Sequence, residues 1–598
     1  MGGKIVQIVS NIIGVIMVCL GIEVSTGPLG QGISNAVGFA IAEKHFAATF
    51  NTESHKIFDH HTYVICGDGC LQEGVSSETS SLAGHLGLGR LIVLYDDNNI
   101  TIDGSTDLSF TEDVGKRYEA YGWQVLTVEN VERTLSGLRD AIETAKATGD
   151  KPTLIKIKTT IGKGSLLEGT ASTHGSPLKP DDMSQAKRGW GLPDEPFSIA
   201  DDVKQFYDAR SKSVETEHAA WIEKYAAYKA ANPEKAAELE RRFSNKVPEG
   251  LADKLPSFDF KNDKAKATRQ YSQACIGSIA PLMPELIGGS ADLTPSNLTA
   301  LSCSGDFQKD TPDGRYLRFG VREHGMAAIC NGLFAYGGMR PFCATFLNFA
   351  GYALGSIRVS ALSKFGVLYI MTHDSIGLGE DGPTHQPIEM IESLRSMPNI
   401  NVFRPADSNE MSMAYKIALE THETPSVICC SRSGLPALEH SSVEKACKGA
   451  YTIIGEDIDV ASADLVIVAT GSEVGCCVEA AAKLSESGIK VRVVSMPCQE
   501  IFLAQTEEYQ RSVLPGNIPT LSVEASSIYG WHRFSHAQIG MTRFGMSAPG
   551  GELFKKFGFS TENVTEKGKA LVEFYKSGSC PDLMNRPVFN NISGEINH

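Results

Sequence analysis

Two short polar motifs, each placed directly after a strand-like apolar run, constrain this chain more than any other feature. Gly67-Asp68-Gly69-Cys70 follows the run 62–66, and Asn98-Asn99 follows the run 91–95. In open α/β sheets, ligands bind beyond the carboxyl ends of the strands, and glycine lets the backbone approach them closely. Carboxylate and amide oxygens suit Mg²⁺ or Ca²⁺ rather than zinc. The pair predicts a metal-assisted diphosphate site; two ordinary βα turns are the alternative.

Length and charge limit the classes of protein that this chain can be. At 598 residues it is too long for one hydrophobic core, so several domains are expected. A net charge of −16 argues against nucleic acid as a partner. An anionic substrate would therefore need a pocket that supplies its own arginines and histidines.

The 14 cysteines do not form a metal or disulfide pattern. Cys429-Cys430 and Cys476-Cys477 are adjacent pairs inside apolar runs, and no second pair stands at zinc-finger spacing from Cys66 and Cys70. Scattered cysteines in apolar surroundings are typical of reduced core residues. We therefore expect a cytoplasmic protein, or a plastid protein if a transit peptide is missing from this version.

Residues 5–22 carry no charge, and the stretch from Ile12 to Leu20 is apolar. A secretory segment or a short membrane span has this composition. Only Lys4 precedes it and no small-residue cleavage site follows, so no membrane role is expected. A buried strand, a helix and a non-native tail remain the alternatives.

The rest of the chain divides into three successive α/β regions. The first, to about residue 195, alternates strands and helices, with a helix at 78–88 and a strand at 153–158. Strand-poor stretches at 215–230 and 234–242 predict bridging helices, and 248–256 predicts a linker. The second region has strands at 367–371, 401–403 and 426–430. The third begins with a strand at 465–469, a helix at 474–485 and a strand at 491–494.

Several long motifs follow one another along this framework. They are Gly27-Pro28-Leu29-Gly30-Gln31-Gly32, the extended glycine turn 67–74, the asparagine segment 95–104, Gly289 to Ser296, Arg322-Glu323-His324, and His373-Asp374-Ser375 through Glu380-Asp381-Gly382-Pro383-Thr384-His385-Gln386-Pro387. Together they resemble the thiamine diphosphate enzymes and, among these, the transketolase family. The resemblance runs from about Gly21 to near the C-terminus.

The resemblance implies an α/β fold of three successive domains with mostly parallel sheets covered by helices. The expected bounds are 1–232 for the diphosphate- and metal-binding domain, 233–445 for the pyrimidine-binding domain and 446–598 for the C-terminal domain. It implies transfer of a two-carbon ketol unit from a ketose phosphate to an aldose phosphate through a cofactor enamine, in the pentose phosphate pathway or the Calvin cycle.

The resemblance also assigns cofactor residues. Asp68, Asn98 and the Ile100 carbonyl would hold Mg²⁺, with Ca²⁺ possible, against the diphosphate. Glu323 would engage the aminopyrimidine ring, and a carboxyl group against an apolar ring face should have a raised pKa. The remaining cofactor contacts would come from Gly27, Leu29, Gly67, Gly69, His174 and Asp292.

Phe346, Phe349 and Tyr352 recur every three residues, which predicts one helical stripe. Such a stripe usually belongs to a hydrophobic core. By resemblance these aromatic faces would instead stack on the pyrimidine ring of the cofactor.

The substrate residues follow from the same motifs. Arg269, Ser296, His373 and Arg432 are expected at the phosphate end, where guanidinium groups bind phosphate in a bidentate manner. Asp381 would take a sugar hydroxyl, and His385 and His174 would stand near the reacting carbon. In this family the site lies between two subunits, where Glu73 meets the partner's Glu323. We therefore expect a two-fold homodimer that acts on sugar phosphates.

One segment departs from the family pattern. Transketolases have an earlier segment with three active-site histidines, whereas the first histidine here is His45 and residues 11–20 match nothing in the family. Three hypotheses follow: a transketolase with a truncated or misjoined N-terminus, a non-catalytic paralogue that pairs with a complete subunit, or another thiamine enzyme such as a dihydroxyacetone or deoxyxylulose phosphate synthase. The first is favoured, with turnover reduced by the missing histidines and no fixed place in the fold for residues 1–20.

Overall fold

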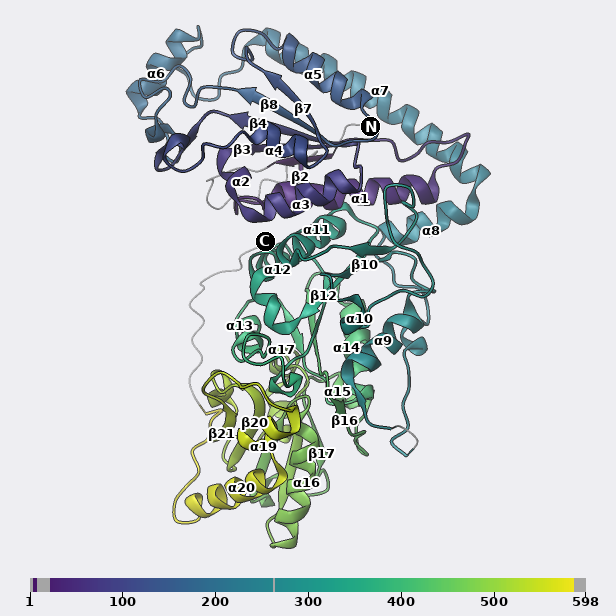
Figure 1. Ribbon diagram of the computed structural model, residues 1–598, viewed down its shortest axis with the longest axis vertical. Coiled ribbons are helices and arrows are strands. Elements are labelled where there is room, and N and C mark those ends of the chain that lie inside the picture. The colour runs from purple at the N-terminus through teal and green to yellow at the C-terminus, as the bar shows by residue number, and fades with distance from the viewer. Residues whose placement is uncertain (1–3, 8–21, 262–263, 586–598) are drawn as a thin grey trace.

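The computed structural model describes residues 4–7, 22–261 and 264–585 (Figure 1). Three α/β domains follow one another along the long axis of the molecule, each built on its own sheet. The strand orders are β2-β1-β3-β4-β8-β7 in the first sheet, β11-β10-β12-β13-β15-β14 in the second and β17-β19-β18-β20-β21 in the third. This confirms the fold class that the sequence predicts.

The first domain has a fully parallel sheet. Its strands are β1 (Lys4–Gln7), β2 (Ile22–Ser25), β3 (Thr62–Gly67), β4 (Leu91–Asp97), β7 (Gln124–Val128) and β8 (Thr153–Lys158), with a small hairpin of β5 (Ile100–Thr101) and β6 (Gly104–Ser105). Its helices are α1 (Gln31–Phe50), α2 (Asp68–Gln72), α3 (Gly74–His85), α4 (Val114–Ala120), α5 (Ser136–Ala147) and α6 (Pro180–Gly189). The predicted strand at 153–158 is confirmed, and the helix predicted at 78–88 begins and ends earlier, as α3.

The N-terminal strand corrects one expectation. Residues 1–20 were predicted to have no fixed place, yet Lys4–Gln7 forms β1, which pairs in parallel with both β2 and β3. A buried strand was among the alternatives for this uncharged run, but sheet pairing is decided by long-range partners that the local sequence does not identify. Residues 8–20 lie outside the described part of the chain.

A helical segment connects the first domain to the second. It consists of α7 (Asp201–Ala231) and α8 (Pro233–Phe243). The two predicted bridging helices are confirmed, although α7 begins 14 residues before the predicted start at 215. After α8 the segment 248–256 contains only one short 3₁₀ turn, Ala252–Lys254, as expected for a linker.

The second domain is also built on a parallel sheet. Its strands are β10 (Leu286–Ser290), β11 (Tyr316–Arg318), β12 (Arg340–Phe346), β13 (Leu368–Thr372), β14 (Asn401–Phe403) and β15 (Ser426–Cys430), with a two-stranded ribbon of β9 (Lys266–Ala267) and β16 (Gly434–Leu435). Its helices are α9 (Thr268–Ile279), α10 (Thr294–Asn297), α11 (Glu323–Tyr336), α12 (Ala350–Leu362), α13 (Met390–Arg395), α14 (Ser408–Glu420) and α15 (Val443–Ala446). Every residue of β12, β13 and β15 is buried, as expected for inner strands of a parallel sheet whose two faces are covered by helices.

The third domain has a mixed sheet, because β17 runs antiparallel to β19. Its strands are β17 (Tyr451–Ile454), β18 (Leu465–Ala469), β19 (Val491–Ser495), β20 (Thr520–Ser527) and β21 (Ala537–Met541). Its helices are α16 (Glu473–Glu486), α17 (Gln499–Leu503), α18 (Glu507–Val513), α19 (Gly550–Lys556) and α20 (Thr561–Tyr575). The predicted strand–helix–strand unit is confirmed as β18, α16 and β19.

Helices α1 and α11 join the first two domains at very close range (Figure 1). A Cβ at Gly38 of α1 would lie 2.3 Å from the Ile329 carbonyl oxygen, and a Cβ at Gly332 of α11 would lie 2.0 Å from the Asn35 carbonyl oxygen. Asn35 also donates its side-chain amide to the Ala328 carbonyl at 2.8 Å. Small residues therefore let the two backbones meet, and one buried apolar cluster runs through both helices.

The described residues contain no helix with the length and apolarity needed to cross a bilayer.

Of the 13 cysteines described, all are free, and Cys303 is the one classed as exposed. This agrees with the expectation of reduced cysteines in apolar surroundings.

Candidate active site

The predicted metal motif is brought together at the carboxyl ends of β3 and β4. Asp68 is the first residue of α2 and is buried. Its carboxylate accepts hydrogen bonds from the Tyr95 hydroxyl and, at 3.1 Å, from the Asn99 backbone N–H. Asn99 has a φ of 60°, in the left-handed region that asparagine adopts more readily than most residues. The asparagine segment therefore turns back onto Asp68.

Negative charge gathers at this turn. Burial raises the pKa of Asp68, hydrogen bonds from Tyr95 and Asn99 oppose this, and Asp97 and Asp96 raise it further. Lys158 lies 2.7 Å from Asp97 and partly compensates that carboxylate. A divalent cation bound to Asp68 would favour its ionised form, so the donors present fit a hard metal ion.

The amide of Asn98 is held in place by its neighbours. Its Nδ2 donates to Asp96 at 3.1 Å, and its Oδ1 accepts the Ile100 N–H at 3.0 Å. Across the described ranges, no group of three or more His, Cys, Asp and Glu side chains is arranged to hold a metal. A site of one carboxylate, one amide and one carbonyl uses few protein ligands, which is the manner in which Mg²⁺ is usually held beside phosphates.

The glycine segment before α1 lies against the same turn. Gly27 and Gly30 have φ values of 71° and 79°, which glycine adopts without strain. A Cβ at Gly69 would lie 2.9 Å from the Leu29 side chain, so Leu29 packs directly over the glycine turn. Leu29 thus lies against the turn that contains Gly67, Asp68 and Gly69, and Gly27 stands two residues before Leu29.

Glu323 begins α11, and the first domain of the same chain fixes that end of the helix. Glu78 accepts the Gly325 N–H at 2.7 Å, and Gln31 lies 2.8 Å from the His324 ring. Burial raises the pKa of Glu323, as expected for a carboxyl group that holds a proton at a ring nitrogen.

The aromatic trio is confirmed as a cluster but not as one helical stripe. Phe346 ends β12, Phe349 lies in the 3₁₀ turn Leu347–Phe349, and Tyr352 lies in α12. The Phe346 and Phe349 rings stack at 5.9 Å, and the Phe349 and Tyr352 rings meet edge to face at 6.2 Å. The strand-to-helix turn, rather than helical periodicity, places the three side chains together.

The predicted phosphate residues form a basic cluster beside these rings. The His373 ring centre lies 3.8 Å from that of Phe346, and Arg269 donates to the Ser296 carbonyl at 2.5 Å. Burial, followed by the charges of Arg269, Arg432 and His385, lowers the pKa of His373 to about 3. These three groups therefore stand close enough to His373 to act on its charge, and the imidazole is neutral at physiological pH.

The loop after β13 carries the other substrate residues. The ring centres of His385 and Phe349 lie 5.1 Å apart, edge to face. The backbone N–H of His385 donates to the Gly382 carbonyl at 3.0 Å and closes a turn. Asp381 is exposed at the tip of this turn. Arg432 is exposed too and donates to the Leu378 carbonyl at 2.9 Å, so it is anchored to the same loop.

The remaining predicted residues lie around these groups, and Glu73 packs against the glycine segment, since a Cβ at Gly30 would lie 2.8 Å from the Cβ of Glu73. Glu73 is exposed between α2 and α3, and Asp292 lines a cavity of about 600 Å³ between α3 and the second sheet. His174 follows the 3₁₀ turn Ala171–Thr173, and its buried Nδ1 has no hydrogen-bond partner among the described residues. An imidazole nitrogen in that state is available to a bound group.

Sequence reasoning missed Tyr95, whose hydroxyl holds Asp68. The signal is the parallel register of β3 and β4, which pairs Cys66 with Tyr95 and Gly67 with Asp96. A side chain at that register position stands next to the glycine turn. Reading the two strands as a pair, rather than as separate motifs, would have identified it.

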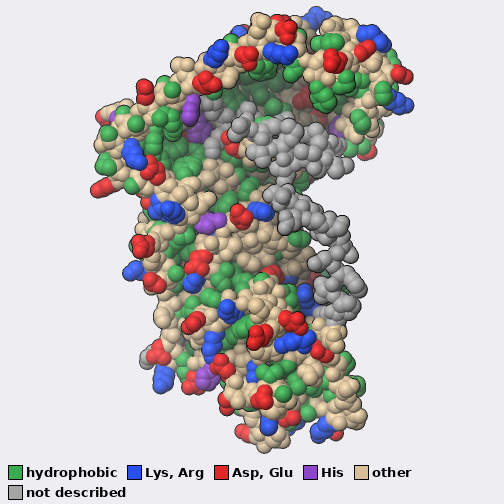
Figure 2. All heavy atoms as spheres, turned by 180° about the vertical axis from the view of Figure 1, so that it is seen from behind, with side chains coloured by type: hydrophobic (Ala, Val, Ile, Leu, Met, Phe, Trp, Pro, Cys, Tyr) green, Lys and Arg blue, Asp and Glu red, His purple; other side chains and the backbone are tan. Residues whose placement is uncertain are grey.

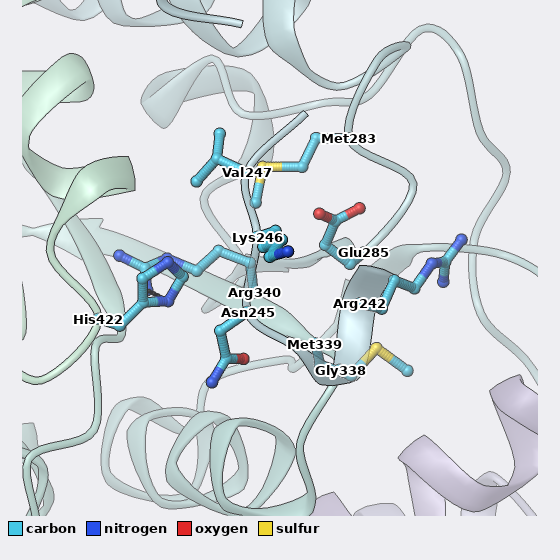
Figure 3. Close-up of a pocket in the computed structure, with 10 residues that line it drawn as sticks. All are labelled: Arg242, Asn245, Lys246, Val247, Met283, Glu285, Gly338, Met339, Arg340 and His422. Carbon is cyan, nitrogen blue, oxygen red and sulfur yellow. Dashed lines mark hydrogen bonds between the residues drawn. The ribbon is translucent and has the colours of Figure 1, made fainter. Parts of the chain in front are cut away.

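Two other features test the location of the site. Figure 3 shows a pocket at the opposite edge of the second sheet, where Arg340 and His422 lie side by side; its volume of about 10 Å³ holds roughly one water molecule. Figure 2 shows acidic and basic side chains mixed over one face of the molecule. The pocket is basic, since Arg242, Lys246, Arg340 and His422 line it, but it has no room for a phosphate group.

Comparison with known proteins agrees with this geometry. Family models match three consecutive parts of the chain: the transketolase thiamine diphosphate binding domain at 15–248, the transketolase pyrimidine binding domain at 264–437 and the transketolase-like C-terminal domain at 449–560. The first match begins before Gly21, which corrects the expectation that residues 15–20 match nothing in the family.

Relatives and solved structures cover most of the chain. Transketolase 1 of Saccharomyces cerevisiae is 52% identical over 93% of this chain and 82% of the relative. Transketolase-1, chloroplastic, of Arabidopsis thaliana is 49% identical over 92% of this chain and 75% of the relative. A Pichia stipitis transketolase structure in complex with sedoheptulose-7-phosphate superposes with a TM-score of 0.92, at 50% identity, over 95% of this chain and 84% of that one.

These relatives are named as enzymes, which favours a transketolase over the non-catalytic paralogue and over the other thiamine enzymes. The chain belongs to the transketolase family of thiamine diphosphate-dependent transferases.

Proposed function

We propose that the chain transfers a two-carbon ketol unit from a ketose phosphate to an aldose phosphate at a site shared by two copies of itself. The observation that carries this proposal is the basic cluster of Arg269, Arg432 and His373 directly beside the stacked Phe346 and Phe349 rings. An anion-binding group next to an aromatic ring pocket suits a phosphorylated substrate that reacts with a ring cofactor.

Each cofactor residue of the site has a defined task in this proposal. Asp68, Asn98 and the Ile100 carbonyl hold Mg²⁺, or Ca²⁺ in its place, against the diphosphate. When bound, thiamine diphosphate supplies a nucleophilic carbon that adds to the donor carbonyl. Glu323 keeps a proton at the pyrimidine ring nitrogen. Phe346, Phe349 and Tyr352 enclose that ring and exclude water.

The substrate residues act on the sugar phosphate. Arg269, Arg432, Ser296 and His373 bind the phosphate, and Asp381 accepts a hydroxyl group near the reacting carbon. His385 and His174 hydrogen-bond the donor carbonyl and the cofactor diphosphate, and His174 has the free buried nitrogen for this. Asp292, which lines the cavity beside α3, is a further cofactor contact in this assignment.

Exposed apolar side chains support the homodimer. Ile102 beside the metal turn is 67% exposed, Val321 beside Glu323 is 73% exposed and Tyr352 is 69% exposed. The metal group and the ring pocket form two clusters in different domains of one chain. A second copy that covers these apolar side chains would bring the metal group of one subunit to the ring pocket of the other, with Glu73 next to Glu323 of the partner subunit.

We also propose the domain bounds 1–232, 233–445 and 446–598. The proposed location is the cytoplasm, because the described cysteines are free and mostly buried. A plastid is the alternative, since one relative is named chloroplastic.

The test mixes two inactive variants, Asp68→Asn and Glu323→Gln. If each site takes its metal group from one subunit and its glutamate from the other, a heterodimer has one intact site and one doubly altered site. Randomly reassociated subunits in equal amounts should then recover about a quarter of the wild-type ketol transfer. Differently tagged subunits verify that heterodimers form. Heterodimers without recovered activity would mean that each site is built from a single chain.

A further inference from the structure

The loop that follows β13 carries His373, Asp381 and His385 on one side and rests on the third domain on the other. We propose that the third domain is the scaffold that positions this loop, and that Glu473, acting through Arg404, is a positioning residue for phosphorylated substrates. The inference rests on the proposed roles of His373, Asp381 and Arg432.

A buried ionic contact crosses from the second domain to the third. Arg404 follows β14 and is fully buried. Its Nε donates to Oδ2 of Asp374 at 3.0 Å, and one Nη donates to the carboxylate of Glu473. Glu473 begins α16 and also accepts the Ala525 N–H at 2.8 Å. One guanidinium therefore ties Asp374 to the sheet of the third domain.

This contact acts next to a strained backbone position. His373 has a φ of 60°, which is uncommon for a residue other than glycine. On one side, Thr372 donates to Oδ1 of Asn297 at 2.7 Å, and on the other, Asp374 is held by Arg404. Such conformations persist only where neighbouring contacts enforce them. Loosening Asp374 would let the turn relax and move the imidazole.

The third domain holds the loop at further points. A Cβ at Gly377 would lie 2.7 Å from the Phe554 ring, and a Cβ at Gly550 would lie 2.8 Å from the Gly377 carbonyl oxygen. Gln386 donates to the carbonyls of Gly379 at 2.8 Å and Met546 at 2.9 Å. Helix α19 and the segment before it therefore press against the 3₁₀ turn Ile376–Leu378 of the loop.

The joint between the two domains is not packed throughout. A cavity of about 250 Å³ lies beside these contacts and is lined by Asp374, Arg432, Glu473 and Phe554 among others. The loop is therefore held at a few separate places. Because continuous packing is absent here, losing one contact should shift the loop.

A shift of the loop would reach the phosphate site first. Arg432 donates to the Leu378 carbonyl at 2.9 Å, and Ser433 donates to the Gly377 carbonyl at 3.0 Å. Movement of Ile376–Leu378 thus carries the guanidinium that binds phosphate. The metal group and Glu323 lie in other segments and would stay in place. The end of the loop with His385 is held separately within the second domain, because Asn348 donates to the Thr384 carbonyl at 2.6 Å and the His385 ring packs on Phe349. The effect should fall on phosphorylated substrates and spare unphosphorylated ones.

The test compares Glu473→Gln with wild type on a ketose phosphate and on unphosphorylated hydroxypyruvate. The variant keeps the side-chain shape but removes the charge that holds Arg404. We expect KM for the ketose phosphate to rise about tenfold, since small misplacements near a site are costly. For hydroxypyruvate, kcat and KM should each stay within about twofold of the wild-type values. The matched control is Glu562→Gln, which removes a surface carboxylate of α20 that pairs at 2.9 Å with Lys483 of α16, the helix that Glu473 begins.

Equal losses on both donors, or no change on either, would overturn the inference. A second variant, Phe554→Leu, loosens the loop from α19 without altering the ionic contact and should give the same split if Glu473→Gln fails to fold. Arg432→Ala distinguishes an error in the proposed phosphate site from an error in the scaffold role. If it fails to weaken the ketose phosphate, the proposed phosphate site is wrong. If it does weaken that donor while both third-domain variants behave as wild type, only the scaffold role is wrong.

Discussion

The backbone N–H of Asn99 donates a 3.1 Å hydrogen bond to Oδ2 of Asp68, across two motifs that are 31 positions apart in the sequence. This contact joins the glycine turn after β3 to the asparagine segment after β4. The side chains of the proposed metal site are therefore brought together by the sheet itself.

Replacing Asp68 by Asn should remove metal-dependent cofactor binding. The substitution keeps the size of the side chain and removes the charge that a divalent cation needs, so we expect affinity for thiamine diphosphate with Mg²⁺ to fall by more than about 100-fold. Isothermal titration calorimetry measures this. Asp107→Asn, at an exposed residue after the β5–β6 hairpin, is the control and should bind normally. Binding by Asp68→Asn at wild-type affinity would refute the metal assignment.

Replacing Arg432 by Ala should mainly weaken phosphorylated substrates. The guanidinium stands at the basic cluster, and a lost charge-assisted bond to phosphate costs roughly 1.5–3 kcal/mol, or about 10- to 150-fold in kcat/KM. Hydroxypyruvate, which has no phosphate, should be nearly unaffected. Steady-state kinetics on both donors decides this, with Arg511→Ala in the third domain as the control. Equal losses on both donors would count against the phosphate role.

The His373 ring should stay neutral wherever the enzyme is active. Its pKa is lowered to about 3 by burial and by the charges of Arg269, Arg432 and His385. Nitrogen NMR of labelled histidine should find a neutral ring at pH 6, and Arg432→Ala should raise the pKa of His373 by removing one of these charges. A protonated ring at pH 6 in the wild-type protein would contradict the described electrostatics.

Glu43 should make stability depend on pH. Burial raises its pKa from 4.5 to about 8, only partly offset by Arg90 at 3.3 Å. Between these values the folded state binds more protons than the unfolded state, so stability falls as pH rises, by at most about 1.4 kcal/mol per pH unit for this group. Glu43→Gln should flatten the decline of the melting temperature between pH 5 and 8. Glu573→Gln, at an exposed residue, should leave it unchanged, and an unchanged slope in Glu43→Gln would show that the carboxyl ionises normally.

Local sequence was enough to predict the buried strands but not the contacts between distant segments. Strands β14 and β15 have the predicted bounds, because each is a short, mostly apolar run whose side chains are largely buried in a parallel sheet. The spacing of Phe346, Phe349 and Tyr352 predicts one helix. The same spacing also fits a strand end followed by a 3₁₀ turn and a helix, which is the arrangement in the structure. The contact of Asp374 with Arg404 and Glu473 joins three separate segments, and only the folded chain reveals which charges share a buried space.

The close approach of α1 and α11 limits how this protein moves. A carbonyl oxygen stands where a side chain at Gly38 or at Gly332 would begin, so neither helix can slide along the other by one residue without a collision between backbones. We therefore expect the first two domains to move as a single body. Opening and closing around a substrate is left to the loops at the carboxyl ends of the strands. Hydrogen exchange should therefore be slow along α1 and α11 both with and without substrate, and should change with substrate in the segments that carry Asp381 and His385.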